Sequence, residues 1–248
     1  MNTNLQQINF SNIQHYSDRI KEVLREIDKK KNAEIDVVEY TRKITKEAYG
    51  DMKRKFGGGT YYEKHLEGVL DLVGDVITDN EDFKKFTEII ALLHDIVEDN
   101  LMSYEKLENM FSQEIRHIVW TLSESKESRG FKEAHIGKVI TFVNDKEVVT
   151  REYTKKDMKV DMLRESLLKI KLLRNLPNQL YYQAAALVRV ADMLHNLSDF
   201  RIQKEDLLDR NMYKAEIILN ELNDTLLTNN LKEVLDELKW LFNGDSNK

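Results

Sequence analysis

The segment ALLHDIVEDN, residues 91–100, places four ionisable side chains in an apolar run. Burying the adjacent His94 and Asp95 without partners would cost free energy. A bound ion would offset that cost, because imidazole nitrogens and carboxylate oxygens are common ligands of divalent transition metals. In a helix, Glu98 would follow His94 by one turn, and Asp99 would follow Asp95 in the same way. The segment therefore predicts a core helix with polar groups beside a metal, the alternative being an ordinary amphipathic helix with surface charges.

Two other segments carry ionisable groups in a similar setting. His65 lies in a helical pattern that follows the glycines at 57–59, and Asp192 lies in ALVRVADMLHNL (186–197), which is apolar enough to be largely buried. A buried carboxylate needs a partner. The predicted metal ligands are His65, His94, Asp95 and Asp192. Two nitrogens and two oxygens without sulfur suit Mn²⁺, Fe²⁺ or Zn²⁺ and leave coordination positions for water and substrate.

Composition predicts an all-α fold. The 248 residues are 41% hydrophobic and include nine glycines and one proline, which is typical of helices with a buried core. Residues 141–153 break the helical pattern, because β-branched residues flank Asn144, Asp145 and Lys146. We therefore expect a helical bundle with a small β-hairpin at 141–153.

Charge and residue usage exclude several classes of protein. The net charge of −6 argues against nucleic-acid binding that depends on a broad basic surface. The absence of cysteine excludes disulfides and thiolate metal sites and fits a cytoplasmic protein. We find neither an apolar run long enough for a membrane span nor a secretory signal, so we expect no membrane partner.

Four sequence motifs now support a family resemblance. They are the basic segment Lys53-Arg54-Lys55, the helix start Tyr62-Glu63-Lys64-His65, the segment from Leu92 to Asp99, and the segment from Val190 to Leu197. In this order they resemble the HD-domain phosphohydrolase superfamily, and within it the RelA/SpoT hydrolase domain and the small alarmone hydrolases. The resemblance covers about residues 35–240 and implies an HD-domain helical bundle.

The chain departs from the family pattern at three places. Leu66 stands where the family usually has proline, and Met193 stands where it has arginine or lysine. Both changes alter neighbours of the predicted ligands and remove none. The segment 130–185 is longer than in the small enzymes and matches poorly.

The resemblance also implies roles for the site residues. The metal would be held by the four ligands above, with Mn²⁺ expected and Zn²⁺ or Fe²⁺ as alternatives. Glu98 and Asp99 would be catalytic: Glu98 would accept a proton from the attacking water, and Asp99 would orient that water or Glu98 itself. The expected substrate-binding residues are Arg54, Lys55, Lys126 and Asn196.

The leading functional hypothesis is metal-dependent hydrolysis of the 3′-diphosphate of (p)ppGpp, an alarmone of the stringent response, to GDP or GTP and pyrophosphate. The alternatives are an HD phosphohydrolase for another nucleotide, such as ppApp or the 2′-phosphate of NADPH, and a nucleotide-binding HD module without turnover. We expect an N-terminal helical extension at 1–33, an HD-type domain at 34–243, a small-molecule nucleotide as partner and a homodimer as one assembly.

Overall fold

The structure, a computed structural model, describes residues 14–31, 34–54, 58–143, 148–175, 179–199 and 205–243. Its helical elements are α1 (Gln14–Lys30), α2 (Val37–Tyr49), the π-helical turn η1 (Tyr62–Leu66), α3 (Glu67–Val76), α4 (Glu81–Leu93), α5 (Tyr104–Met110), α6 (Gln113–Leu122), α7 (Lys126–Glu133), α8 (Lys155–Leu172), the 3-10 turn η2 (Leu173–Asn175), α9 (Gln179–Ser198), α10 (Glu205–Glu221) and α11 (Thr228–Asn243). The strands are β1 (Val139–Val143) and β2 (Val148–Glu152), so the predicted all-α class with a small hairpin is confirmed.

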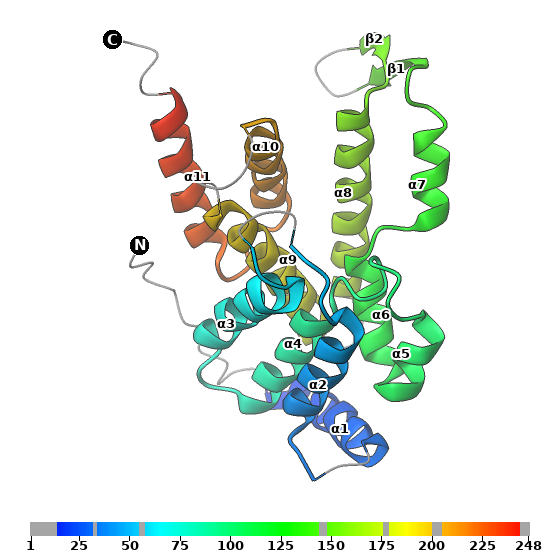
Figure 1. The fold of residues 1–248 in the computed structure, drawn as a ribbon. Helices are drawn as coiled ribbons and strands as arrows, with labels where there is room; N and C mark the ends of the chain where they lie inside the picture. Colours follow the sequence, from blue (N-terminus) through cyan, green and yellow to red (C-terminus); the bar gives the residue numbers. More distant parts are fainter. Residues whose placement is uncertain are drawn as a thin grey trace.

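Helix α9 runs through the middle of the molecule and packs against α3, α4, α6, α8, α10 and α11 (Figure 1). Its residues Ala184 to Ala186 and Val188 are almost inaccessible to solvent, which is expected of a helix that packs against neighbours on several sides. Helix α4 is also largely buried, and the side chain of Asn80 caps it by accepting a hydrogen bond from the Phe83 backbone N–H at 3.0 Å. These two helices position three of the predicted metal ligands.

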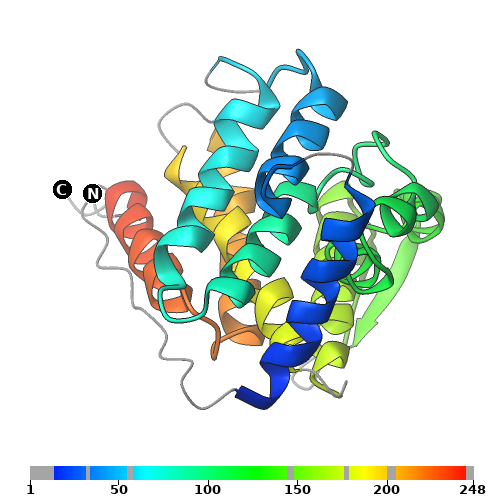
Figure 2. The same ribbon diagram turned by 90° about the horizontal axis from the view of Figure 1, so that it is seen from below.

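Helix α1 lies across the outside of α4 (Figure 2). Its residues Ile20, Val23 and Ile27 are buried and belong to the same hydrophobic core as α4 and α9. Residues 1–13 lie outside the described residues. The division of the chain at residue 33 stays a prediction.

The segment from α7 to α8 extends beyond the bundle and carries the hairpin, as Figure 1 shows. Strands β1 and β2 pair antiparallel, from Val139 opposite Glu152 to Val143 opposite Val148. Thr154 and Asp157 then form a capping box that begins α8. Residues 144–147, where the sequence predicts the turn, lie outside the described residues.

The predicted core helix at 91–100 is wrong in its extent. Helix α4 ends at Leu93, and residues 94–100 form turns that end at Asn100, which has a φ of 63°. Residues 104–122 form two helices, α5 and α6, because the hydroxyl of Ser112 caps a new helix by accepting from the Ile115 N–H. In the part of the chain that the structure describes, every helix is too short or too polar to cross a membrane.

Candidate active site

The four predicted metal ligands come together from three segments. His65 lies in η1, His94 and Asp95 directly follow α4, and Asp192 lies in α9. His94 Nε2 is 3.1 Å from Asp95 Oδ2, and His65 Nε2 is 3.4 Å from Asp192 Oδ1 and 3.7 Å from Asp95 Oδ2. Ligand atoms of His65, His94 and Asp95 all lie within 4.8 Å of one another, as a single bound ion requires.

One nitrogen of His94 is left without a hydrogen bond. Its Nδ1 lies 2.7 Å from the backbone oxygen of Ala91, to which it donates, so in a neutral ring Nε2 carries the lone pair. Nε2 is buried and makes no well-aligned hydrogen bond among the described residues, although Asp95 Oδ2 lies 3.1 Å away. Native proteins seldom leave such an atom unpaired, and a metal ion at Nε2 would satisfy it. The residues present therefore fit a divalent cation.

His195 orients the second histidine ligand. Its Nδ1 lies 3.3 Å from His65 Nδ1. Burial and the nearby His65 and Arg54 lower the pKa of His195 to about 3, so this imidazole is neutral at physiological pH. A neutral His195 can accept the Nδ1–H of His65, which leaves His65 Nε2 facing the carboxylates. His195 follows Asp192 by three residues in α9, which brings its ring to the same site.

The buried histidines and carboxylates of the site shift one another's pKa values. Burial would lower the pKa of His94, but Asp95 and Asp192 raise it to about 9. Burial would raise the pKa of Asp192, but His65 and His94 lower it to about 2. The two carboxylates thus stay charged and attract positive charge into a buried site, which a divalent ion would supply.

Two tyrosines that sequence reasoning missed support the acidic residues. The rings of Tyr49 and Tyr61 stack with centroids 5.2 Å apart at 13°. The Tyr61 hydroxyl donates to Asp95 Oδ2, and the Tyr49 hydroxyl donates to Asp99 Oδ2 at 3.0 Å. Tyr61 precedes His65 by four residues and could have been found from that spacing, but Tyr49 lies in α2 and has no local signal.

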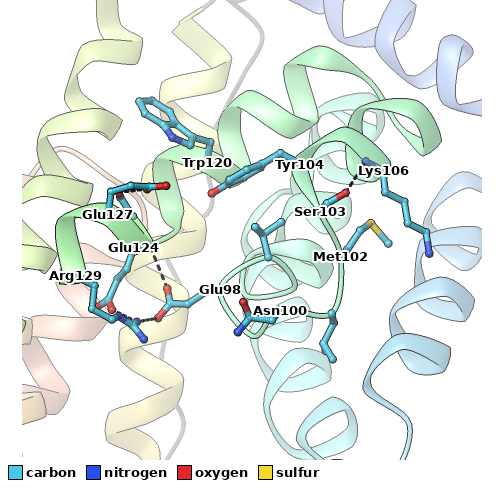
Figure 3. A pocket seen from close by; sticks show the side chains of 13 residues that line it. Glu98, Asn100, Met102, Ser103, Tyr104, Lys106, Trp120, Glu124, Glu127 and Arg129 are labelled. Atoms are coloured by element: carbon cyan, nitrogen blue, oxygen red, sulfur yellow. Dashed lines mark hydrogen bonds and ion pairs between the residues drawn. The ribbon is translucent and has the colours of Figure 1, made fainter. Parts of the chain in front are cut away.

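Glu98 does not lie on the same helical face as His94, because the helix ends before both residues. Its Oε2 accepts from the backbone N–H of Glu124 at 3.2 Å, and its Oε1 accepts from Arg129 at 3.2 Å (Figure 3). Burial, Asp95 and Glu124 raise the pKa of Glu98 to about 7. Other titratable groups near Glu98 are Tyr49, Tyr104, Lys169 and Arg189. A carboxyl that titrates near neutral pH suits proton transfer.

Glu98 also lines two cavities. The inner cavity, of about 180 Å³, is lined by Glu98 together with His65, Asp95 and Asp192. The outer pocket, of about 510 Å³, is lined by Glu98 together with Tyr104 and Trp120 (Figure 3). Glu98 is therefore within reach of molecules that enter the inner cavity.

Two predicted substrate-binding residues lie at the inner cavity. Arg54 donates to Asn196 Oδ1 at 3.3 Å, and Asn196 donates to Asp192 Oδ1 at 2.7 Å. Arg54 is also held by an ion pair with Asp199. Its loop folds back on itself, since Tyr61 N donates to Met52 O at 2.7 Å.

The other two predicted substrate-binding residues cannot be placed in the same way. Lys55 lies outside the described residues, and the side chain of Lys126 is not among those that the structure describes. Their predicted roles stay predictions. The inner cavity contains two further cations that the sequence did not single out, Arg189 and Lys214.

Comparison with known proteins agrees with the sequence motifs. No model of a known protein family matches the chain. The chain is 29% identical over 165 residues to two sequences named as the chloroplastic GTP diphosphokinase RSH1 of Arabidopsis thaliana. The match covers 66% of this chain but only 15% of RSH1. A solved structure of a metazoan ortholog of SpoT that hydrolyzes ppGpp is similar, with a TM-score of 0.53 and 20% identity, over 82% of this chain and 93% of that chain.

This chain is similar in sequence to RSH1 and similar in fold to the metazoan SpoT ortholog. The predicted helical bundle is confirmed by this similarity of fold. In this RelA/SpoT-like chain the two unusual residues beside the ligands, Leu66 and Met193, are buried in the core at 0% and 4% exposure. They pack against neighbouring side chains and leave the ligand set complete.

Proposed function

We propose that this protein is a metal-dependent phosphohydrolase that removes the 3′-diphosphate of (p)ppGpp, giving GDP or GTP and pyrophosphate. The observation that carries the proposal is the buried, unpaired His94 Nε2 beside Asp95, with His65 and Asp192 within reach of the same point. The similar metazoan protein hydrolyzes ppGpp, which supports the choice of substrate. The metal we expect is Mn²⁺, with Zn²⁺ and Fe²⁺ as alternatives.

Four side chains would hold the ion: His65, His94, Asp95 and Asp192. When bound, the ion supplies a Lewis acid that offsets the charge of the phosphoryl oxygens and makes water easier to deprotonate. Tyr61 would fix the carboxylate of Asp95, and His195 would fix the ring of His65.

Glu98 would act as the general base. In hydrolysis, a bond forms between the water oxygen and the phosphorus, and the bond from that phosphorus to the 3′ oxygen of the ribose breaks. Glu98 would take the proton from the water and return a proton to the departing 3′ oxygen. Asp99, held by Tyr49, would orient the water or Glu98.

Positive and amide groups would hold the nucleotide. Arg54 and Asn196 lie together at the inner cavity, where a guanidinium can stack on a base or bind phosphate and an amide can bind ribose or base. Lys55 and Lys126 would supply further positive charge to the phosphates. We also propose the cytoplasm as the location, a homodimer as one assembly and no nucleic-acid partner.

The test is a panel of substrates. Purified protein with Mn²⁺ is incubated with ppGpp, pppGpp, ppApp, NADPH and ordinary nucleotides, and the products are separated by chromatography. We expect pyrophosphate and GDP or GTP from the guanosine alarmones. Preferential release from ppApp or NADPH would support the second hypothesis, and binding without turnover would support a sensor module.

A matched pair of variants assigns the chemistry. Glu98→Gln should lower turnover by about 10²–10⁴-fold while metal content, measured by mass spectrometry, is unchanged. The exposed Glu233 in α11 is the control, since Glu233→Gln makes the same chemical change far from the site. Loss of the metal in Glu98→Gln would instead make Glu98 a ligand.

A further inference from the structure

A strongly basic cavity lies between α8 and α10, which face each other in Figure 1. Its volume is about 320 Å³. Its lining residues are Lys155, Lys156, Lys159, Asp209 and Arg210. Four cations against one carboxylate make this cavity positive, although the whole chain carries a net charge of −6. A local cluster of this kind favours an anionic ligand.

The cations of this cavity differ in their partners, since Lys159 pairs with Glu124 at 3.6 Å and Lys156 Nζ lies 5.1 Å from the centroid of the Tyr213 ring. In the described part of the chain, neither Lys155 nor Lys156 has a carboxylate within ion-pair distance. The nearby Asp157 is engaged by Arg151 at 2.6 Å. Arg210 has a buried Nε without a hydrogen-bond partner among the described residues. The unpaired donors therefore remain available to a ligand.

Positive charge continues from this cavity toward the metal ligands. Lys159 lies 3.6 Å from Glu124, which also lines the inner cavity. Lys214 lines the inner cavity as well, and burial together with Lys159, Arg189 and Arg210 lowers its pKa. The cations around Lys214 are thus close enough to repel one another, as cations that surround a polyphosphate site do.

A third cavity lies between the basic cavity and the inner cavity and shares lining residues with both. Arg54, Tyr61 and Asn196 line both the inner cavity and a neighbouring cavity of about 340 Å³. Arg210 lines that neighbouring cavity and the basic cavity. A ligand with one phosphate group at the metal ligands and a nucleoside beside Arg54 would therefore direct its other end toward α8 and α10.

We propose that the basic cavity lined by Lys155, Lys156, Lys159 and Arg210 binds the distal phosphate chain of the substrate. The protein then selects nucleotides that carry phosphate groups at both ends, with the 3′-diphosphate at the metal ligands and the 5′-phosphates between α8 and α10. This inference rests on the proposed function. Three of the four cations belong to α8, in the segment that the family motifs do not cover.

The test compares substrates that differ only in the number of 5′-phosphates: pppGpp, ppGpp, pGpp and guanosine 3′-diphosphate. The Lys155→Ala/Lys156→Ala variant should raise KM for pppGpp and ppGpp by about tenfold and leave kcat within about twofold, since each lost charge contact contributes a modest free energy. Guanosine 3′-diphosphate should be processed equally by variant and wild type. The control is Lys138→Ala/Lys232→Ala, which removes the same charge from two exposed lysines outside the cavity.

Binding separates this inference from the proposed function. The same four nucleotides are titrated calorimetrically into the Glu98→Gln protein, with and without the two lysine substitutions. Affinity that increases with the number of 5′-phosphates, and loses this dependence in the lysine variant, supports the site even if wild type fails to turn over any of the four. An equal loss of affinity for all four nucleotides, or no loss, overturns it.

Discussion

His65 Nδ1 lies 3.3 Å from His195 Nδ1, and the His195 ring fits against the backbone of Gly68. A Cβ at Gly68 would lie 2.1 Å from His195 Nε2, which is closer than atoms can approach. Gly68→Ala should therefore push His195 away and release the ring of His65. We expect Mn²⁺ affinity to fall about 10–100-fold, the usual effect of losing a group that orients a metal ligand.

The control for this prediction is the other glycine of α3. A Cβ at Gly74 would meet only the flexible ends of Glu88 and Lys84, the nearest at 3.1 Å. Gly74→Ala should leave metal affinity unchanged and stabilise the helix by up to about 1 kcal/mol. Metal titrations and thermal melts of both variants decide, and equal Mn²⁺ affinity in the two proteins would contradict the role of His195.

Glu98 should make the metal-free protein less stable at high pH. Its pKa is about 7 in the folded protein against an ordinary value of 4.5, so the folded state holds this proton more tightly than the unfolded chain. Stability contributed by the protonated form is present below pH 4.5 and is lost as the pH rises through 7. Glu98→Gln cannot ionise and should avoid this loss.

The measurement is urea unfolding in EDTA at pH 4.5 and pH 8. Compared with wild type, Glu98→Gln should have a similar free energy of unfolding at the lower pH and one higher by roughly 1–3 kcal/mol at pH 8. Glu233→Gln should match wild type at both. If the difference in free energy of unfolding between Glu98→Gln and wild type were the same at both pH values, ionisation of Glu98 would not destabilise the folded protein.

The sequence predicted the residues whose type is unusual for their surroundings. His94, Asp95 and Asp192 stand in apolar runs, and a buried ionisable group needs a partner whatever the fold, so their convergence could be inferred. The end of α4 at Leu93 could not be inferred from the sequence. Residues 94–100 keep the helical spacing of apolar side chains, and Asn100 at their end adopts a positive φ. The stack of Tyr49 on Tyr61 depends on how α2 packs against the start of η1. This packing leaves no signal in the residues around either tyrosine.

Arg129 is another residue that no local pattern indicated, and its removal should change how activity depends on pH. It donates to Glu98 Oε1 and pairs with Glu124, so Arg129→Met removes the cation shared by the two carboxylates and leaves Lys159 beside Glu124 alone. Their repulsion should raise the pKa of Glu98 further. A base must be ionised to act, so the variant should lose several-fold more activity near pH 6.5 than at pH 8.5.

Two further variants test this reading of Arg129. Arg129→Lys restores the charge and should recover part of the activity at low pH. Lys132→Met changes a cation of the same helix that pairs with Glu165 instead, and its pH profile should match that of wild type. If Arg129→Met lowered activity by one factor at every pH, Arg129 would support only the structure of α7.

Tyr61 and Tyr49 should differ in their effect on the metal although they stack on each other. The Tyr61 hydroxyl donates to the predicted ligand Asp95, whereas the Tyr49 hydroxyl donates to Asp99, which is not a predicted ligand. Tyr61→Phe keeps the stacked ring and should lower Mn²⁺ affinity by about tenfold, because the Asp95 carboxylate is no longer fixed. Tyr49→Phe should leave Mn²⁺ affinity unchanged and lower only turnover. Calorimetric Mn²⁺ titrations and ppGpp turnover of both variants distinguish the roles, and equal Mn²⁺ affinities would mean that Tyr61 does not hold Asp95 for the metal.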